Sequence, residues 1–325
     1  LGTSPAFLAC IEEMAGAAQS DVPILLNGES GVGKELAAKF IHNKSNRRAH
    51  PFVSIDCTAI SEGIFESELF GHERGAFTGC VGRRHGLIES AENGTLFMDE
   101  IGEVPLALQG RLLRALETGY YRRLGGREDL HANVRIICAT HNNLRKMVEQ
   151  GTFRADLYYR IAGISITIPP LRERRGDITP LVKAMLEKTR TANGDAARIT
   201  EDALEMLQNY DYPGNIRELH NLLQKAVAVS ANGLVTKEQL QLNDFSNIYI
   251  NPLADRRRTD RSSGKPNSPS TNRSLTDVEA THIESLLHQH DGHRAKVAEE
   301  LRISERTLYR KLKQYNLQDV GKNRN

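Results

Sequence analysis

The sequence predicts an α/β fold in which a parallel sheet carries helices on both faces, followed by a small all-α domain and an all-α module near the carboxyl terminus. Three observations support it. Apolar runs alternate with helical patterns over the first 170 residues, which is typical of a parallel sheet covered by helices. A glycine-rich turn joins the first apolar run to the helical pattern after it. Beyond Pro169 and Pro170, helical periodicity continues without strand patterns.

The glycine-rich turn at residues 28–35 follows an apolar run at residues 22–26 and precedes a helical pattern at residues 36–41. Its glycines let backbone N–H groups surround an anion, and the helix adds its positive end. The order strand, loop and helix therefore predicts a nucleotide site rather than an ordinary glycine turn. Its expected residues are Gly28, Glu29, Ser30, Gly31, Val32, Gly33, Lys34 and Glu35. Lys34 would hold the outer phosphates, whereas Glu35 replaces the usual Ser or Thr ligand of magnesium.

Further strands are predicted by apolar runs at residues 52–56, 94–99, 134–140 and 164–168. The run at residues 94–99 ends in Asp99 and Glu100, at the edge where open parallel sheets bind their ligands. We expect Asp99 to hold Mg²⁺, directly or through water, and Glu100 to polarise a water toward the terminal phosphate. A buried strand that simply ends in solvated acids is the alternative.

Length and composition predict a globular protein of about two or three domains, because 325 residues with 39% hydrophobic content bury a full core. No apolar run approaches the roughly 20 residues that span a bilayer, so we expect a cytoplasmic protein without a membrane partner. The four cysteines are scattered without a CxxC pair, which predicts neither disulfides nor a zinc site. The first residue is Leu rather than Met, so we expect a piece of a longer protein.

The charge is divided unevenly along the chain. Residues 255–325 carry 15 Lys and Arg against 10 Asp and Glu, a net +5, which leaves 28 against 31, a net −3, for residues 1–254. This difference predicts a basic nucleic-acid module after a weakly acidic body, although a solvated basic tail has the same charge.

Beyond the predicted sheet, helical patterns lie at residues 178–189, 200–209 and 215–230, and again from residue 275.

We therefore expect five segments. They are an α/β subdomain at 1–170, a small helical subdomain at 171–243, a linker at 244–274 rich in Ser, Pro, Asn and Gly, a helical module at 275–317 and a disordered tail at 318–325. Within the module, helices are expected at 275–289, 295–301 and 305–315.

The last helix of the module has an apolar face formed by Leu308, Leu312 and Tyr315 and a basic face opposite. This layout predicts a helix-turn-helix unit that dimerises on double-stranded DNA, although any basic amphipathic hairpin would share the pattern. The residues expected to contact DNA are Arg306, Thr307, Tyr309, Arg310, Lys311 and Lys313.

Six motifs together resemble the central AAA+ domain of the sigma-54-dependent transcriptional activators, the NtrC-like bacterial enhancer-binding proteins. In order they read GESGVGKE, ESELFGHERGAFTGC, GTLFMDEIGEVP, FRADLYYR, PPLRERRGDI and YPGNIREL, and residues 306–312 resemble a Fis-type domain. In that family the phosphate loop commonly ends in GKE, as it does here. The resemblance implies ATP and Mg²⁺ as cofactors, a ring of six or seven subunits, and ATP hydrolysis that remodels sigma-54 RNA polymerase holoenzyme for open-complex formation.

The resemblance also implies residue roles. The helical subdomain at 171–243 corresponds to the lid of the AAA+ family. Thr140 takes the sensing position, and Arg217 reads the nucleotide state from the lid. Arg154 and Arg160 reach the ATP of the neighbouring subunit. Without the family, the sequence favours a solvated ion-pair face that includes Asp156 over this role for Arg154 and Arg160.

Two further features concern how ATP hydrolysis would be controlled and coupled to sigma-54. Residues 75–80 resemble the GAFTGA signature, in which Phe77 and Thr78 contact sigma-54, with Cys80 in place of the usual Ala. Asp56 replaces an Asn that holds the catalytic Glu in most relatives, so Asp56 is a switch candidate that would repel Glu100 unless a proton or cation intervenes.

Two other functions are alternatives to ATP-driven remodelling of the sigma-54 holoenzyme. The first is a DNA-binding regulator in which nucleotide drives assembly only. The second is an ATP-dependent remodeller of some other protein.

Overall fold

The computed structural model describes residues 2–58, 62–76, 82–189, 197–230, 233–240, 283, 286–287, 290, 293–300 and 305–315. The chain forms two compact units, Leu1–Pro252 and Leu253–Asn325. No helix in the described ranges has the length and apolar character needed to cross a membrane. The predicted linker and the predicted tail lie outside the described residues.

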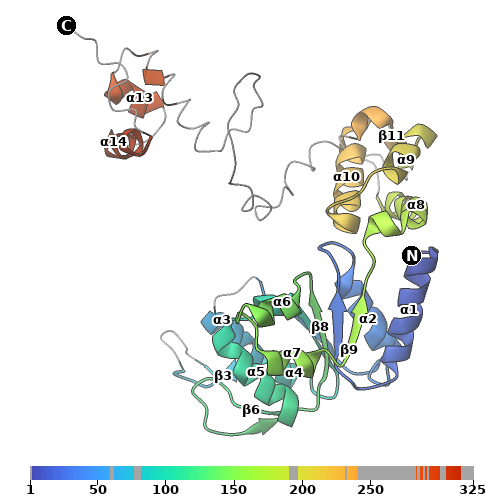
Figure 1. The fold of residues 1–325 in the computed structure, drawn as a ribbon, viewed down its shortest axis with the longest axis vertical. Coiled ribbons are helices and arrows are strands. Elements are labelled where there is room, and N and C mark those ends of the chain that lie inside the picture. Colours follow the sequence, from blue (N-terminus) through green and yellow to red (C-terminus); the bar gives the residue numbers. More distant parts are fainter. Residues whose placement is uncertain are drawn as a thin grey trace, which may run out of the picture. The chain divides into compact units, whose positions relative to one another are not determined.

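The first unit is built on a five-stranded parallel sheet with the strand order β2-β5-β8-β1-β9 (Figure 1). These strands are β1 (Ile24–Asn27), β2 (Phe52–Asp56), β5 (Thr95–Asp99), β8 (Arg135–Thr140) and β9 (Ile164–Thr167). They correspond to the five predicted apolar runs, which confirms the predicted fold class. Because the strands are parallel, their carboxyl ends meet at one edge, where Asp56 is opposite Asp99 and Asn27 is opposite Thr140.

Helices cover both faces of this sheet, because alternate side chains of each strand point to opposite sides. Ile24 and Phe97 pack in the same core as α1 (Pro5–Ala18) and α2 (Lys34–Lys44), whereas Leu25 and Leu96 face the other core. The helices contributing to the second core are α3 (Glu62–Phe70), α4 (Leu87–Ser90), α5 (Leu106–Thr118), α6 (Leu144–Glu149) and α7 (Ala155–Ile161). The doubly covered sheet explains why the strands read as continuous apolar runs.

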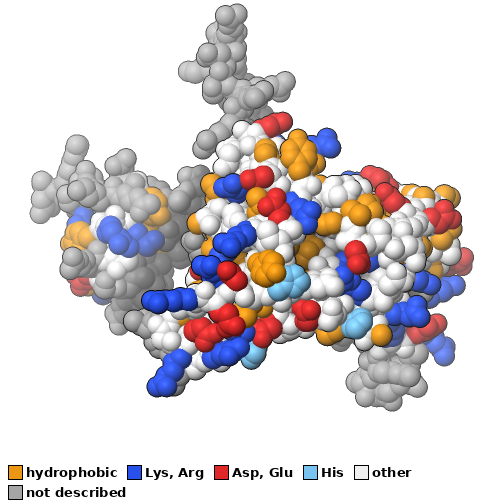
Figure 2. Space-filling view, turned by 90° about the horizontal axis from the view of Figure 1, so that it is seen from below, with side chains coloured by type: hydrophobic (Ala, Val, Ile, Leu, Met, Phe, Trp, Pro, Cys, Tyr) orange, Lys and Arg blue, Asp and Glu red, His pale blue; other side chains and the backbone are white. Residues whose placement is uncertain are grey.

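Short two-stranded pairings, which the sequence did not predict, supplement the main sheet. They join β3 (Gly71–His72) to β4 (Arg84–His85), β6 (Tyr120–Tyr121) to β7 (Leu130–His131), and β10 (Arg198–Ile199) to β11 (Leu234–Val235). Side chains of both charges are interspersed with hydrophobic ones on the face seen in Figure 2.

The lid follows the sheet as a small helical bundle with its own apolar core. It contains two 3-10 turns, Leu171–Glu173 and Arg175–Asp177, and the helices α8 (Ile178–Lys188), α9 (Glu201–Gln208) and α10 (Asn215–Val229). The three helices agree with the predicted ranges to within one or two residues at each end. A last short turn covers Lys237–Gln239.

The second unit contains α13 (Arg294–Glu300) and α14 (Glu305–Gln314), close to the predicted ranges. Leu308 and Leu312 are buried against Val297 and Leu287, and Tyr315 packs beside them, which confirms the predicted apolar face of α14. Most of the helix predicted at residues 275–289 lies outside the described residues.

Candidate nucleotide-binding site

The phosphate loop joins β1 to α2 at the carboxyl edge of the sheet. Gly31 and Gly33 have φ angles of +79° and +103°, a region that residues with a side chain rarely adopt. At Gly31 the lid also approaches closely, because an added Cβ would lie 2.3 Å from the carbonyl oxygen of Gly214. The helix α2 begins at Lys34, so its N-terminal N–H groups face the loop, as anion binding requires.

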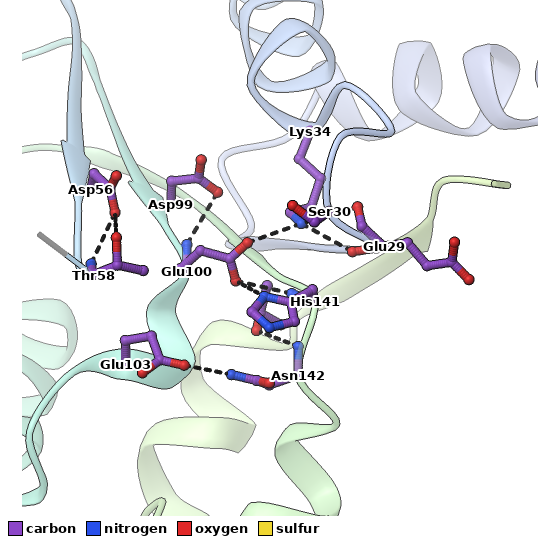
Figure 3. Close-up of polar contacts among 12 residues, drawn as sticks. Glu29, Ser30, Lys34, Asp56, Thr58, Asp99, Glu100, Glu103, His141 and Asn142 are labelled. Carbon is purple, nitrogen blue, oxygen red and sulfur yellow. Dashed lines mark hydrogen bonds and ion pairs between the residues drawn. The ribbon is translucent and has the colours of Figure 1, made fainter. Parts of the chain in front are cut away.

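Lys34 is buried and its ammonium is held by three oxygen atoms. It donates to the carbonyl oxygens of Gly28 at 3.0 Å and Glu29 at 3.4 Å, and it forms an ion pair with Glu100 Oε1 at 3.1 Å (Figure 3). The lysine predicted from the loop and the carboxylate predicted from β5 therefore contact each other directly.

A cavity of about 210 Å³ opens beside Lys34. It is lined by Ser30, Gly31, Gly33, Lys34, Glu35, Leu36, Asp99, Glu100 and Arg217. Arg217 reaches it from the lid helix α10, and its Nη1 donates to Ser30 Oγ at 2.9 Å. Residues predicted from three separate motifs therefore converge on one cavity.

Glu100 is the most constrained residue of this cavity. Its backbone is left-handed, with φ 52° and ψ 52°, a strain of about 1–3 kcal/mol that is typical of functional sites. Its Oε2 lies 2.6 Å from His141 Nδ1 and accepts from the His141 backbone N–H at 3.1 Å. Burial raises the pKa of Glu100, but the hydrogen bonds from His141 and the Lys34 ammonium outweigh burial, and the net pKa lies below its ordinary value. The carboxylate is therefore ionised.

Asp99 lies beside Glu100 and has the opposite shift. Burial, and then the charge of Glu100, raise the pKa of Asp99 above its ordinary value. A cation at Asp99 would relieve this repulsion. The described residues hold no cluster of three or more His, Cys, Asp or Glu suited to a metal ion. Mg²⁺ commonly takes one or two carboxylates together with waters and phosphate oxygens, so Asp99 fits such a site. Glu35 instead pairs with Lys39 on the exposed side of α2 at 2.6 Å.

Asp56 and Thr140 flank this edge. The Asp56 carboxylate accepts hydrogen bonds from the backbone and hydroxyl of Thr58, at 2.9 and 2.7 Å, while Glu100 contacts Lys34 and His141. Glu100 is thus paired with the Lys34 ammonium, whereas the hydrogen bonds of Asp56 go to Thr58. Thr140 is buried, and its hydroxyl accepts from the backbone N–H of Asn142 at 2.9 Å. The switch role of Asp56 and the sensing role of Thr140 stay predictions.

The lid is seated directly on the phosphate loop. Arg172 donates two hydrogen bonds to the Glu29 carboxylate, at 2.8 and 2.7 Å, and Asn215 Nδ2 donates to the same group at 3.0 Å. These bonds, led by that from Arg172, hold the pKa of Glu29 below its ordinary value. The backbone N–H of Ile216 donates to the carbonyl of Gly31 at 3.0 Å. The sequence analysis did not predict this contact between the lid and the phosphate loop, because its residues are far apart along the chain.

Arg160 lies on α7 and Arg154 is the N-cap residue just before it, and neither of the two lines the 210 Å³ cavity. Arg154 forms an ion pair with Asp156 at 2.7 Å, and both side chains are about half exposed. Arg160 donates from Nε and Nη2 to the carbonyl oxygen of Leu116, at 3.1 and 2.7 Å. The ion pair that the sequence offered as the alternative does form. A role toward a second subunit stays a prediction.

Phe77, Thr78 and Cys80 lie outside the described residues. The structure does describe the base of their loop, where Arg123 is buried and forms ion pairs with Glu73 at 3.0 Å and Glu89 at 2.6 Å.

A second, larger cavity of about 650 Å³ adjoins the phosphate loop and was not predicted. Gly33 and Leu36 line both cavities. Its walls are mainly apolar and come from α1, α2 and the lid, including Phe7, Ile11, Met14, Val32, Phe40, Leu181, Met185 and Ile216. A flat apolar ring fits such walls. The walls come from five separate segments, at residues 7–14, 32–40, 168–174, 181–189 and 216–224, so no local pattern could have predicted this cavity.

In the second unit, α14 presents Tyr309 and Arg310 to solvent. The Arg294 guanidinium lies 5.0 Å from the centre of the Tyr309 ring. Thr307 and Lys311 are partly exposed, and the side chains of Arg306 and Lys313 lie outside what the structure describes.

Comparison with known proteins supports the same assignment along the whole chain. Residues 1–167 match the family described as "Sigma-54 interaction domain", residues 172–247 "AAA+ ATPase lid domain", and residues 274–315 "Bacterial regulatory protein, Fis family". The regulatory protein AtoC of Escherichia coli K12 is 40% identical over 322 residues, which cover 98% of this chain and 68% of AtoC. A Nif-specific regulatory protein of Sinorhizobium fredii is 46% identical over 246 residues, 76% of this chain and 41% of that protein.

Among solved structures, NtrX from Brucella abortus in complex with ATP is similar with a TM-score of 0.69 and 30% identity, covering 97% of this chain and 68% of NtrX. The chain thus spans about two thirds of AtoC and NtrX and less than half of the Nif-specific protein. The family match, which covers more than half of the chain, and the similarity to AtoC place it plainly: this chain belongs to the sigma-54-dependent transcriptional activators.

Proposed function

We propose that this chain binds ATP with Mg²⁺, hydrolyses ATP to ADP and phosphate within a ring of subunits, and uses the hydrolysis to activate transcription by sigma-54 RNA polymerase holoenzyme. The observation that carries the proposal is the convergence of Lys34, Asp99, Glu100 and Arg217 on one cavity in a chain of this family.

The two adjoining cavities suit the two halves of ATP. The phosphates would accept hydrogen bonds from the N–H groups of residues 28–35 and from the start of α2, next to Lys34. The base would enter the 650 Å³ apolar cavity, whose wall at Gly33 and Leu36 is shared with the phosphate cavity. The related NtrX was crystallised in complex with ATP, which supports the proposed binding of ATP.

The ion pair between Lys34 and Glu100 suggests how substrate binding prepares the reaction. The triphosphate carries several negative charges against the single charge of Glu100, so the Lys34 ammonium would turn to the phosphates and release Glu100 Oε1. The free carboxylate oxygen can then accept a hydrogen bond from water and orient the water toward the terminal phosphate. The other oxygen of the Glu100 carboxylate, Oε2, would stay in its contact with His141. Mg²⁺ held through Asp99 would neutralise charge on the phosphates.

Guanidinium groups would complete the site. Arg217 already contacts the loop from the lid and would turn to the phosphates. Arg154 and Arg160, at the start and near the end of α7, are exposed and would act on the ATP of a neighbouring subunit, where such an arginine is worth roughly 10³ to 10⁵ in rate. The proposal therefore includes a ring, of six or seven subunits.

The movement driven by ATP hydrolysis would be passed to sigma-54 by the loop at residues 75–80, through contacts made by Phe77 and Thr78. The α14 helix would bind double-stranded DNA as a dimer, with Tyr309 and Arg310 exposed for the groove.

The substitution Glu100→Gln tests the proposal, because it removes a charge and keeps the shape of the side chain. We expect ATP binding to persist while ATP hydrolysis and open-complex formation at a sigma-54 promoter are lost. If E100Q still drives open-complex formation, nucleotide serves assembly only and the motor mechanism is wrong.

A further inference from the structure

Asp177 links two parts of the first unit that are distant along the chain. Its carboxylate is fully buried, at 0% exposure. Oδ1 accepts from the backbone N–H groups of Thr3 at 2.6 Å and Ser4 at 2.7 Å, and Oδ2 accepts from the Ser4 hydroxyl at 2.8 Å. More than 170 residues separate the partners. Figure 1 shows the start of α1 near α8, whose first residue follows Asp177.

The local structure does not require these bonds. Asp177 is the N-cap residue of α8, where a carboxylate ordinarily accepts from the N–H groups of its own helix, yet its side chain makes no such capping bond. Ser4 is the N-cap of α1 and likewise makes no side-chain capping bond. Both polar side chains instead serve a contact between α1 and the lid. A buried carboxylate persists only when its hydrogen bonds are satisfied, so this contact is specific.

Arg174 makes a second set of contacts, to α1 and to the phosphate loop, next to those of Asp177. Its guanidinium is buried and lies 4.6 Å from the centre of the Phe7 ring, and its Nη2 donates to the carbonyl of Val32 in the phosphate loop at 3.0 Å. The 3-10 turn Arg175–Asp177 and the residue before it therefore hold α1 and the phosphate loop together.

These contacts lie next to the 650 Å³ cavity, which is bordered by α1, the phosphate loop, α2 and the lid. From α1 it is lined by Phe7, Ile11 and Met14, and from the lid by Leu181 and Met185. If α1 were not held against the lid, one wall of this cavity would have no fixed position. Asp177 does not line the cavity, so it would act only through α1.

We propose that Asp177 is a positioning residue that fixes α1 as a wall of the cavity for the base and so sets the affinity for ATP without touching ATP. The proposal rests on the proposed binding of ATP. It predicts that loss of the Asp177 bonds weakens binding of the nucleoside half of ATP and spares binding of the phosphates, which the loop and Lys34 hold.

The test compares ATP with inorganic tripolyphosphate, both titrated calorimetrically into the 325-residue chain in magnesium buffer. For Asp177→Ala we expect the affinity for ATP to fall about tenfold or more and the affinity for tripolyphosphate to stay within about twofold. For Asp177→Asn we expect near-wild-type binding of both, because Oδ1 still accepts the two backbone N–H groups and Nδ2 donates to Ser4 Oγ. Asp202→Ala, which removes an exposed lid carboxylate, is the matched control.

Two results would overturn the proposal: ATP affinity unchanged in D177A, or affinities for ATP and tripolyphosphate reduced by the same factor. Should D177A fail to fold by circular dichroism, Ser4→Ala removes the hydroxyl bond alone. A selective loss for ATP of about twofold to fivefold then supports the proposal, and unchanged ATP affinity contradicts it. A wild-type chain that does not bind ATP would instead contradict the proposed function.

Discussion

Replacing Gly31 by Ala tests the contact between the lid and the phosphate loop, and Gly33 supplies a matched control. Both glycines have positive φ, so an Ala at either position is strained by about 1–3 kcal/mol. Their surroundings differ. At Gly31 the new Cβ would lie 2.3 Å from the Gly214 carbonyl oxygen and 3.0 Å from Arg217 Cβ, whereas at Gly33 the nearest atom is Ile216 Cδ1 at 4.0 Å.

The clash at Gly31 involves backbone, which cannot rotate away, so the lid must move. We therefore expect Gly31→Ala to lower the free energy of unfolding by about 1–3 kcal/mol more than Gly33→Ala, the usual range for an overpacked site. Urea denaturation at fixed pH measures both values. An open α1 position, Gly16, has no atom within 4 Å of a new Cβ, so Gly16→Ala should be neutral or stabilising by up to about 1 kcal/mol.

Hydrogen exchange of a single amide reports where the strain goes. The Ile216 N–H donates to the Gly31 carbonyl at 3.0 Å, so displacement of the lid breaks this bond. Exchange at Ile216 should accelerate in G31A and stay slow in G33A. Equal unfolding free energies and equal exchange in the two variants would refute the claim that the lid rests on the loop.

Two further predictions concern assembly and pH. Arg154→Ala should abolish turnover and retain ATP binding, and turnover per wild-type subunit should rise with protein concentration; turnover independent of concentration would contradict a shared site. His42 is buried, with Nδ1 2.9 Å from Thr95 Oγ1, and burial, followed by the charge of Arg135, holds the pKa of His42 below its ordinary value. The unfolded chain then binds more protons, so the free energy of unfolding should fall as the pH drops below about 6.5. Urea midpoints at pH 8 and 5.5 should therefore differ less in His42→Gln, and an identical difference would refute the assignment.

The sequence predicted the sheet well because the three central strands β1, β5 and β8 are buried on both faces, so that each forms an apolar run. The range 52–56 agrees with β2 at both ends, and the α2 helix begins at Lys34, two residues before the apolar pattern at Leu36. That early start has a physical reason: the last loop residue, Gly33, ends in a left-handed conformation, after which Lys34 enters the helix directly. Periodicity of apolar side chains cannot show a helix turn made of charged residues.

Contacts between distant residues could not be predicted in the same way. The bonds from Arg172 to Glu29 and from Thr3 and Ser4 to Asp177 join segments more than 140 residues apart, and no local pattern encodes them. His141 was visible as a residue next to Thr140 at a strand end, but its contact with Glu100 depends on the left-handed turn at Glu100.

The lid contacts of the phosphate loop divide into two kinds, and the division bears on how nucleotide state would reach the lid. Arg217 lines the 210 Å³ cavity, so bound phosphates would compete with Ser30 for its guanidinium. Arg172 does not line that cavity, and its bidentate pair with Glu29 needs no change when phosphate binds. Under the proposed function, Arg217 would therefore respond to the bound phosphates, whereas Arg172 would keep its contact with Glu29. Of these two arginines of the lid, Arg217 is the one whose contact would change with the nucleotide.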